Sequence, residues 1–477
     1  MNDFVASLML LGALSGGNSL PFWSTTGQYG LMPGSSGALA VVQAGTSYDE
    51  SKTFQWKWGV SLAANTDPAV MVDQCYASLR WKALSLDLGM KHPDLYFMAS
   101  DSRLGSLSVT GGRVAESGNA RSMPGYRINL DPVAVPFTGR HLFIYGSFGD
   151  FKTLDKRYVQ GALVHRTRAF LMLSIAERFE FHLGLDHYGI WGGNSPVYGP
   201  MPITFDNYFR VITGRNASAA GSHSDRMNVI GDQGGAELFK WKWKGDGWSV
   251  TLQHDIPYND RSGIELGNFP DGVNTLHFGF EDKDRWVSDL LYEYHYTMYQ
   301  SGSIHDNEFD ENGNFRQWTP DLNFRGMDNY FNNGEYRSGW TYYGRTIGHP
   351  LFFPKGTRSG TWDPSGIVQG VENNRLQAHH IGVSGKLFRK APYKLMLTYS
   401  LNYGTYSASY AGESPRQKPW GSVKETPLRQ VSAAFTGEVP EIFGVRGLTL
   451  LYGIFADKGS VLPDCAGATL GLIYTLH

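Results

Sequence analysis

The side chains best suited to chemistry in this sequence are aromatic, amide and arginine residues gathered between positions 299 and 375. Flat aromatic rings can stack on the apolar faces of sugar rings, while amides and arginines can pair with sugar hydroxyls. Pairing matters because a buried polar group without a hydrogen bond costs about 1–3 kcal/mol. The candidate ligand-binding residues of this stretch are Trp318, Tyr330, Asn332, Asn333, Tyr336, Trp340, Tyr342, Tyr343 and Arg345. The set predicts a loop that binds polysaccharide.

A second stretch, 191–233, carries similar residues and adds Trp191, Asn194 and Tyr198 to the candidate set. Prolines just after Tyr198 stiffen this stretch by fixing φ. Loops as long as these are uncommon unless they are functional or disordered, and their aromatic content argues against disorder. The alternative is that these side chains pack a plug into the mouth of the fold. Plugging and binding are compatible, and both stay open here.

Catalytic and metal-binding alternatives are also present. His182 and Asp186 are four positions apart on one predicted strand face, and with Ser174 they could form a hydrolase site. Charges on such a face more commonly pair with each other, so we expect no enzyme. His379 and His380 point to opposite faces of a strand and cannot share an ion. No run of the six to eight oxygen ligands that Ca²⁺ prefers is visible, so no metal or other cofactor is expected.

Composition limits the fold class. The chain has 477 residues, 58 of them Gly, with 14% aromatic and 18% charged residues. Mean hydropathy is −0.31, and no stretch approaches the roughly 18 apolar residues of a membrane helix. The net charge of −2 does not indicate a nucleic-acid partner. Two cysteines, Cys75 and Cys465, are too few for a disulfide scaffold, although whether they pair is open. A soluble β protein and a transmembrane β-barrel remain.

Alternation of apolar and polar residues favours the barrel. In 395–403 the odd positions are Leu, Leu, Tyr, Leu and Tyr, and the even ones are Met, Thr, Ser and Asn. This period of two is typical of a strand with one apolar face. The apolar faces carry aromatic residues near the segment ends, such as Trp241 and Trp243, as the interfacial girdles of outer-membrane barrels do. The opposite faces mix charges with Gly and Ser, as a polar lumen requires.

About eighteen strands can be placed by this pattern. They are expected near 5–14, 37–46, 53–64, 70–82, 84–92, 125–132, 141–149, 168–176, 179–190, 234–243, 248–257, 275–282, 286–298, 376–387, 393–405, 428–439, 448–457 and 468–477. From the eighth strand onward, short turns alternate with long loops, which is the loop pattern of bacterial outer-membrane barrels. Residues 93–167 are irregular and are expected to hold a plug or periplasmic helices.

The ends of the chain fit the same architecture. No basic segment precedes the apolar run from Val5 to Leu14, so this run is interpreted as the first strand of a mature chain and not as a signal peptide. The alternating segment that ends at His477 is interpreted as the strand that closes the barrel. The prediction is one domain over 1–477, an all-β transmembrane antiparallel barrel with minor helical content, periplasmic termini and long extracellular loops that plug the lumen.

Several short strings then carry a family resemblance, and their order along the chain is more informative than any one of them. The strings are Pro21-Phe22-Trp23, Ser117-Gly118-Asn119-Ala120-Arg121-Ser122-Met123-Pro124, Leu185-Asp186-His187 with Trp191-Gly192-Gly193, Asp328-Asn329-Tyr330-Phe331-Asn332-Asn333, Gly339-Trp340-Thr341-Tyr342-Tyr343-Gly344-Arg345, and Asn373-Asn374-Arg375 with His379-His380. The chain resembles the capsule assembly protein Wzi family, in particular its Bacteroidetes-type branch.

The resemblance implies an 18-stranded barrel in the outer membrane of a Gram-negative bacterium. It implies a lectin that binds capsular polysaccharide and helps to anchor it to the cell, without enzymatic activity or cofactors. The expected partners are outer-membrane lipid, a capsular or other surface polysaccharide, and proteins of an envelope complex. Two further functions remain as alternatives: a porin-like channel, and a structural subunit of an outer-membrane complex.

Overall fold

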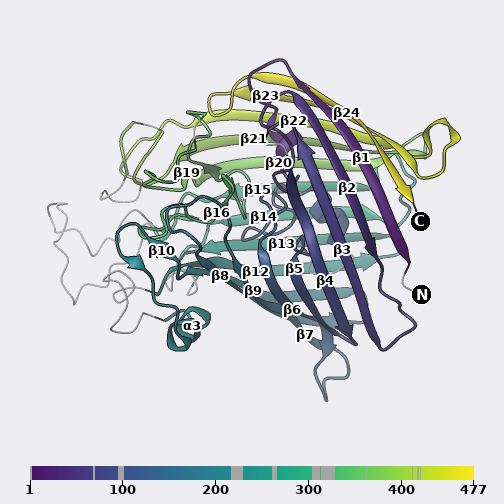
Figure 1. Cartoon of the computed structure of the whole chain (residues 1–477), viewed down its shortest axis with the longest axis horizontal. Helices are drawn as coiled ribbons and strands as arrows, with labels where there is room; N and C mark the ends of the chain where they lie inside the picture. Colours follow the sequence, from purple (N-terminus) through teal and green to yellow (C-terminus); the bar gives the residue numbers. More distant parts are fainter. Residues whose placement is uncertain are drawn as a thin grey trace.

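Eighteen antiparallel strands form one closed barrel in the computed structural model (Figure 1). The structure describes residues 3–67, 70–94, 101–215, 229–259, 266–302, 312, 328–360, 362–410, 412–415, 418 and 421–476. The barrel strands are β1 (Phe4–Ser15), β2 (Gly37–Thr46), β3 (Phe54–Asn65), β4 (Met71–Trp81), β5 (Leu84–Met90), β6 (Pro124–Ala134), β7 (Leu142–Lys152), β8 (Leu163–Ile175), β9 (Phe179–Trp191), β12 (Asp232–Gly245), β13 (Trp248–Tyr258), β14 (Gly272–Phe280), β15 (Asp289–Tyr296), β20 (Arg375–Leu387), β21 (Ala391–Gly404), β22 (Leu428–Val439), β23 (Leu448–Gly459) and β24 (Cys465–Leu476).

The first and last strands close the sheet. β1 pairs with β2 on one side and with β24 on the other, and Leu10 lies opposite Leu472 across the closing pair. Closure leaves no unpaired sheet edge, which is the condition for placing strands in lipid. The expectation of a closed antiparallel barrel with about eighteen strands is therefore confirmed, and each expected segment overlaps one barrel strand.

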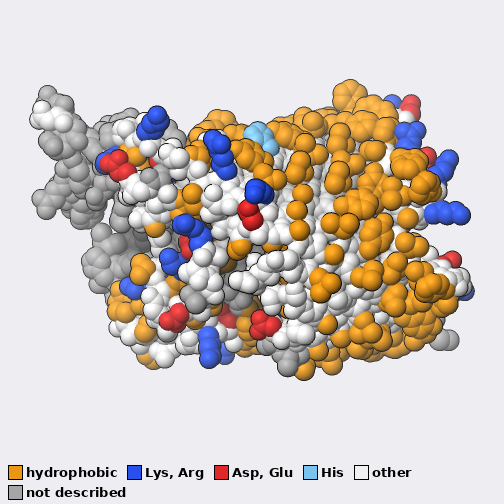
Figure 2. Space-filling view, turned by 90° about the horizontal axis from the view of Figure 1, so that it is seen from above, with side chains coloured by type: hydrophobic (Ala, Val, Ile, Leu, Met, Phe, Trp, Pro, Cys, Tyr) orange, Lys and Arg blue, Asp and Glu red, His pale blue; other side chains and the backbone are white. Residues whose placement is uncertain are grey.

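Alternation sorts the side chains into a lumen face and an outer face. On β12, Lys240 and Lys242 are buried in the lumen, whereas Trp241 and Trp243 on the outer face are 39% and 60% exposed. Figure 2 shows hydrophobic side chains spread over the barrel wall, with mixed charged and polar side chains toward one end. This apolar outer surface matches the lipid-facing band expected of a membrane barrel. No helix in the described parts of the chain is long and apolar enough to cross a membrane.

The two ends of the barrel differ in their connections. One end, called here the turn end, holds both termini and short connections such as 176–178, 246–247 and 388–390. The other end, called here the loop end, holds longer connections such as 192–231 and 297–374. Residues 91–123 also leave the barrel wall at the loop end, between β5 and β6. Between residues 93 and 167 the structure describes one helix, Ser102–Leu107, which is reached from the loop end, together with β6, β7 and the start of β8.

Short elements occupy the lumen and the loop end, and one 3-10 turn lies at the turn end. The helices are α1 (Phe22–Thr25), α2 (Ser102–Leu107), α3 (Phe205–Ile212) and the 3-10 turn η3 (Ile442–Gly444). The small hairpins pair β10 (Asn194–Ser195) with β11 (Gly199–Pro200), β16 (Thr341–Tyr342) with β17 (Arg345–Thr346), and β18 (Phe353–Pro354) with β19 (Val371–Asn373). α1 contacts β22 and β23, and α2 contacts β15 and β20, while α3 packs on β8 and β9.

Packing inside the wall predicts one unequal pair of glycine substitutions. A Cβ at Gly184 would lie 1.8 Å from the Phe170 ring. A Cβ at Gly12 would meet only the backbone carbonyl oxygen of Leu470, at 3.7 Å. Gly184→Ala is therefore expected to lower the free energy of unfolding by about 1–3 kcal/mol, as overpacking does. Gly12→Ala is the control and should be close to neutral. Denaturant unfolding in detergent micelles measures both, and equal stabilities would contradict the packing described here.

Candidate functional site

A plug segment, residues 101–123, crosses the lumen and contacts several parts of the wall. Ser108 Oγ donates to Glu293 Oε1 at 2.6 Å, and the Val114 amide donates to Asp255 Oδ2 at 2.7 Å. The Leu107 carbonyl lies 2.8 Å from His380 Nε2. These contacts reach β13, β15 and β20, so the plug segment is fastened to one run of neighbouring strands, β13-β14-β15-β20.

Buried ion pairs add a second set of attachments. Glu116 of the plug segment lies 2.6 Å from Arg166 and 3.4 Å from Arg168, both on β8. It also pairs with Arg127 of β6 at 3.3 Å. Arg113 of the plug segment pairs with Asp186 of β9, which Arg166 also contacts at 3.2 Å. The plug and the wall thus share one network of alternating charge.

The network keeps Glu116 ionised. Burial opposes the charged form, but Arg166, Arg127, Arg168 and Arg113 together outweigh it and lower the pKa of Glu116 to about 2. Asp101, at the start of α2, behaves in the same way, because Lys240 and Lys242 overcome its burial and lower its pKa. Charged plug groups are therefore matched to charged wall groups, as low-dielectric surroundings require.

The 297–374 loop forms a second layer over the plug segment. Trp340 is fully buried, its indole nitrogen donates to the Ala115 carbonyl at 2.7 Å, and its ring stacks on Tyr188 with centroids 3.8 Å apart. Ser117 Oγ donates to the Gly348 carbonyl at 2.6 Å. Asn119 Nδ2 donates to the Thr346 carbonyl at 3.1 Å. The loop and the plug segment therefore pack as one body.

Most of the aromatic residues predicted to bind sugar are inside this body. The buried members in this body are Tyr330, Asn332, Tyr336, Trp340 and Tyr342, whereas the buried Trp191 stacks on Tyr208 of α3 outside it. Their polar groups hold other loops: Tyr330 Oη donates to Asp271 Oδ2 at 2.8 Å, and Tyr336 Oη donates to the Gly192 carbonyl at 3.2 Å. Their ring faces are occupied by protein, so the structure gives them a packing role. Trp318 lies outside the described residues.

The remaining candidates lie at the surface of the loop end. Asn194, Tyr198 and Tyr343 are exposed, and Asn333 and Arg345 are half-buried. Asn194 and Tyr198 belong to the β10–β11 hairpin. Backbone hydrogen bonds between Asn194 and Gln160 join this hairpin to the connection between β7 and β8. The structure therefore separates the predicted set into a buried packing group and an accessible group.

Tyr343 is the accessible aromatic with the most charged neighbourhood. It is 44% exposed, and the Arg121 guanidinium lies 4.4 Å from its ring centroid. Arg345 is adjacent, because a Cβ at Gly30 would lie 3.3 Å from Arg345 and 3.6 Å from Arg121. Burial, with a further contribution from Arg121, lowers the pKa of Arg345 to about 10. Within the described ranges neither arginine has a carboxylate partner.

Sequence reasoning did not assign a role to Arg121, although the string Ser117–Pro124 that contains it was singled out. Trp362, which packs over Gly344 of the same hairpin, was also missed. Neither residue stands in a periodic pattern of apolar and polar residues, because each packs against residues that are distant in the sequence.

The other predicted chemistry is not assembled. His182 bonds to Tyr145 Oη at 2.8 Å, and Asp186 is held by arginines, so these residues and Ser174 do not form one site. In the part of the chain that the structure describes, no three His, Cys, Asp or Glu residues are grouped to hold a metal ion. Cys75 and Cys465 are both free thiols in the structure.

One cavity of about 780 Å³ remains in the lumen on the turn side of the plug segment. It is lined by α1, α2 and the turn-end residues of β20 to β24, including Lys386, Tyr393 and Glu438. This hollow extends from the plug segment toward the turn end.

Replacing Glu116 by Gln should loosen the plug. The substitution leaves four arginines facing one fewer carboxylate, and breaking a buried ion pair costs about 3–5 kcal/mol. Glu413→Gln is the matched control, since Glu413 pairs with Lys418 at the surface, where such a pair is worth about 0–1 kcal/mol. Thermal unfolding in micelles measures the difference in melting temperature between the two variants. Equal effects of the two substitutions would contradict a stabilising role of the buried Glu116 ion pairs.

The same network predicts how stability depends on pH. The folded pKa of Glu116, about 2, is below the ordinary value of 4.5, so its contribution is fully present above pH 4.5. That contribution should fall progressively as the pH drops from 4.5 toward 2. Unfolding midpoints measured at a series of pH values test this. Glu116→Gln should reduce the loss of stability between pH 4.5 and pH 2. An identical loss in the variant would count against the assignment.

Comparisons with known proteins come from structure alone. No family model and no curated protein matches the chain. A solved structure of Wzi, an outer-membrane carbohydrate-binding β-barrel involved in group 1 capsule assembly in Escherichia coli, aligns over 99% of this chain and 84% of its own, with a TM-score of 0.56 and 13% identity. Pseudomonas aeruginosa OpdK aligns over 99% and 98%, with a TM-score of 0.48 and 9% identity. OccK5 (OpdH) of the same organism aligns over 99% and 98%, with a TM-score of 0.47 and 9% identity. At such identities the Wzi alignment establishes the fold, and the chain has the architecture of an outer-membrane β-barrel.

Proposed function

We propose that this chain is a polysaccharide-binding barrel of the bacterial outer membrane, similar to Wzi-type lectins of the Bacteroidetes branch, and that its polysaccharide site is non-enzymatic. It would bind capsular or other surface polysaccharide at the loop end and help to hold it on the cell. In this arrangement the loop end is extracellular and the turn end, with both termini, is periplasmic. The apolar outer wall supports contact with outer-membrane lipid.

The observation that carries the proposal is the surface formed by Tyr343, Arg121 and Arg345. An exposed aromatic ring offers a flat apolar face to a sugar ring. Each guanidinium presents five donors in a fixed plane, which suits hydroxyl and carboxylate oxygens. Arg121 and Arg345 lack acidic partners among the described residues, so their positive charges suit an anionic or polar ligand, although Arg345 also donates to the Thr25 carbonyl at 3.4 Å. The exposed side chains of Asn194 and Tyr198 supply further polar contacts at the same end.

The filled lumen favours binding over conduction. The plug segment and the 297–374 loop pack against each other and against the wall through the Trp340 and Glu116 contacts described above. A porin-like function would need a continuous aqueous path past these contacts. A role as a subunit of a larger envelope complex is compatible with sugar binding, and the proposed partners include such proteins.

Binding should depend on Tyr343. Tyr343→Ala removes the ring and is expected to weaken polysaccharide binding at least tenfold, which is about 1.4 kcal/mol, while Tyr343→Phe should retain most of the affinity. Trp286→Ala is the control, because Trp286 is an equally exposed aromatic near the turn end. Binding to an immobilised panel of acidic and neutral bacterial polysaccharides measures the effect. Unchanged binding in Tyr343→Ala, or an equal loss in Trp286→Ala, would contradict the proposal.

A further inference from the structure

A hydrogen-bonded Asp–His–Thr row lies on the outer face of the barrel and not in the lumen. His165 and Thr167 are two residues apart on β8 and therefore share a face, and Asp150 pairs directly with His165 across from β7. His165 Nδ1 lies 2.9 Å from Asp150 Oδ1, and His165 Nε2 lies 2.7 Å from Thr167 Oγ1. The three side chains thus form one continuous relay.

The direction of the relay follows from what each group can donate. An ionised Asp150 only accepts hydrogen bonds, so His165 Nδ1 must carry the proton that points to it. In a neutral ring Nε2 then has a lone pair, and the Thr167 hydroxyl donates to it. This is the arrangement in which a histidine acts as the base for a hydroxyl nucleophile.

Asp150 is held in place by two further donors. The Tyr208 hydroxyl of α3 donates to Asp150 Oδ2 at 2.5 Å, and the Tyr126 hydroxyl of β6 donates to the same oxygen. His165 is fully buried between the edge-on rings of Phe148 and Tyr208. The base is therefore fixed in orientation, and it approaches the exterior beside Thr167, which is only half-buried.

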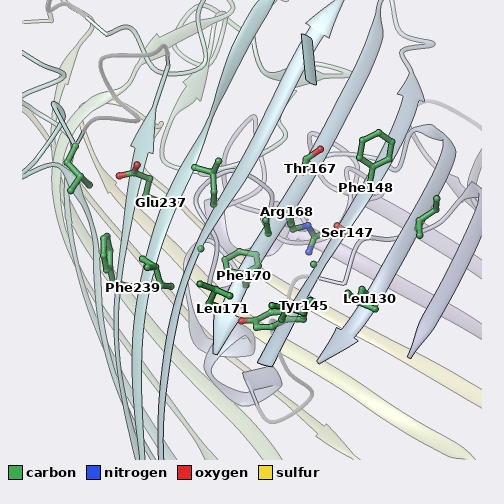
Figure 3. A pocket seen from close by; sticks show the side chains of 18 residues that line it. Leu130, Tyr145, Ser147, Phe148, Thr167, Arg168, Phe170, Leu171, Glu237 and Phe239 are labelled. Atoms are coloured by element: carbon green, nitrogen blue, oxygen red, sulfur yellow. The ribbon is translucent and has the colours of Figure 1, made fainter. Parts of the chain in front are cut away.

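Thr167 stands at the rim of an apolar hollow of about 780 Å³ in the outer wall. Figure 3 shows Thr167 and Phe148 on neighbouring strands, with Leu171 and Phe239 also around the hollow. Small residues make the depression, because Gly146 and Ala169 face each other across β7 and β8 where larger side chains flank them. The volume lies within the range of about 300–1,000 Å³ typical of small-molecule sites.

The position of Thr167 along its strand matches the chemistry of a lipid. Toward the turn end, the outer face of β8 continues as Ala169, Leu171 and Leu173, which are exposed and apolar. Toward the loop end it continues as His165. Thr167 therefore marks the edge of the apolar band, and in a bilayer this edge is the boundary between acyl chains and headgroups. Fatty-acyl ester bonds lie at that boundary.

We propose that Asp150, His165 and Thr167 form a second site, which hydrolyses fatty-acyl esters of membrane lipid with the acyl chain in the hollow. Thr167 Oγ bonds to the ester carbonyl carbon while its proton passes to His165 Nε2. The bond from that carbon to the alcohol oxygen breaks, and the alcohol leaves with the proton from His165. Water then attacks the acyl-threonine, gives a proton to His165 Nε2, and releases the fatty acid as Thr167 recovers its proton. The inference is independent of the sugar-binding proposal, since the two sites share no residue.

The test uses the purified full-length barrel and p-nitrophenyl dodecanoate in detergent micelles. Release of p-nitrophenol is expected, and Thr167→Val and His165→Asn should each reduce it by about 100-fold or more, since removing a nucleophile or its base abolishes most of the rate. Thr167→Ser should retain activity. His379→Asn is the matched control, because His379 is an outer-wall histidine that bonds only to Tyr292 within the described structure and lies on other strands.

Two further readouts separate catalysis from a structural role in fastening α3. Ala169→Phe should fill the hollow and raise KM for the dodecanoate ester while leaving p-nitrophenyl acetate hydrolysis unchanged. A dodecyl fluorophosphonate should modify Thr167, as read by peptide mass spectrometry, in wild type and not in Thr167→Val. Absence of hydrolysis by wild type, equal hydrolysis by Thr167→Val, or modification at another residue would each overturn the proposal.

Discussion

The structure depends on pairing buried charges inside the lumen, where little water is available to solvate them. Alternation places half of every strand in the lumen, so arginines, lysines and carboxylates of the wall face inward. The plug segment supplies their partners: Glu116 meets the arginines of β6 and β8, Arg113 meets Asp186, and Asp101 meets the lysines of β12. Removing the plug would leave these wall charges uncompensated, which explains why the lumen is filled where the charges are densest.

Filling the lumen has a consequence for the loops. Once the plug segment is fixed, its carbonyls and hydroxyls offer hydrogen bonds to whatever covers it, and the 297–374 loop takes them through Trp340 and the 346–348 backbone. Most aromatic side chains of that loop therefore pack inside the protein. What remains at the surface is a smaller set, in which Tyr343 and two arginines without acidic partners in the described ranges are prominent.

The barrel could be predicted from sequence because its signal is local. A period of two, repeated with turns at regular intervals, identifies strands such as β12 and β21 without knowledge of their partners. The plug contacts could not be predicted, since Arg113 and Asp186 are 73 positions apart and Arg113 lies outside any periodic pattern. Aromatic content identified the loop that packs over the plug but could not tell which ring faces protein would occupy. The Asp150–His165–Thr167 row was missed for a different reason: the strand was expected to begin at 168, whereas β8 begins at Leu163.

We propose that buried charge pairing between plug and wall keeps this barrel closed, so that its loop end serves as a binding surface and not as the mouth of a pore. Planar-bilayer recording of single barrels tests it most directly. The claim predicts no stable conductance for the wild-type chain and stable open steps after residues 101–123 are replaced by a short flexible linker. Steady porin-like conductance of the wild-type chain would contradict it.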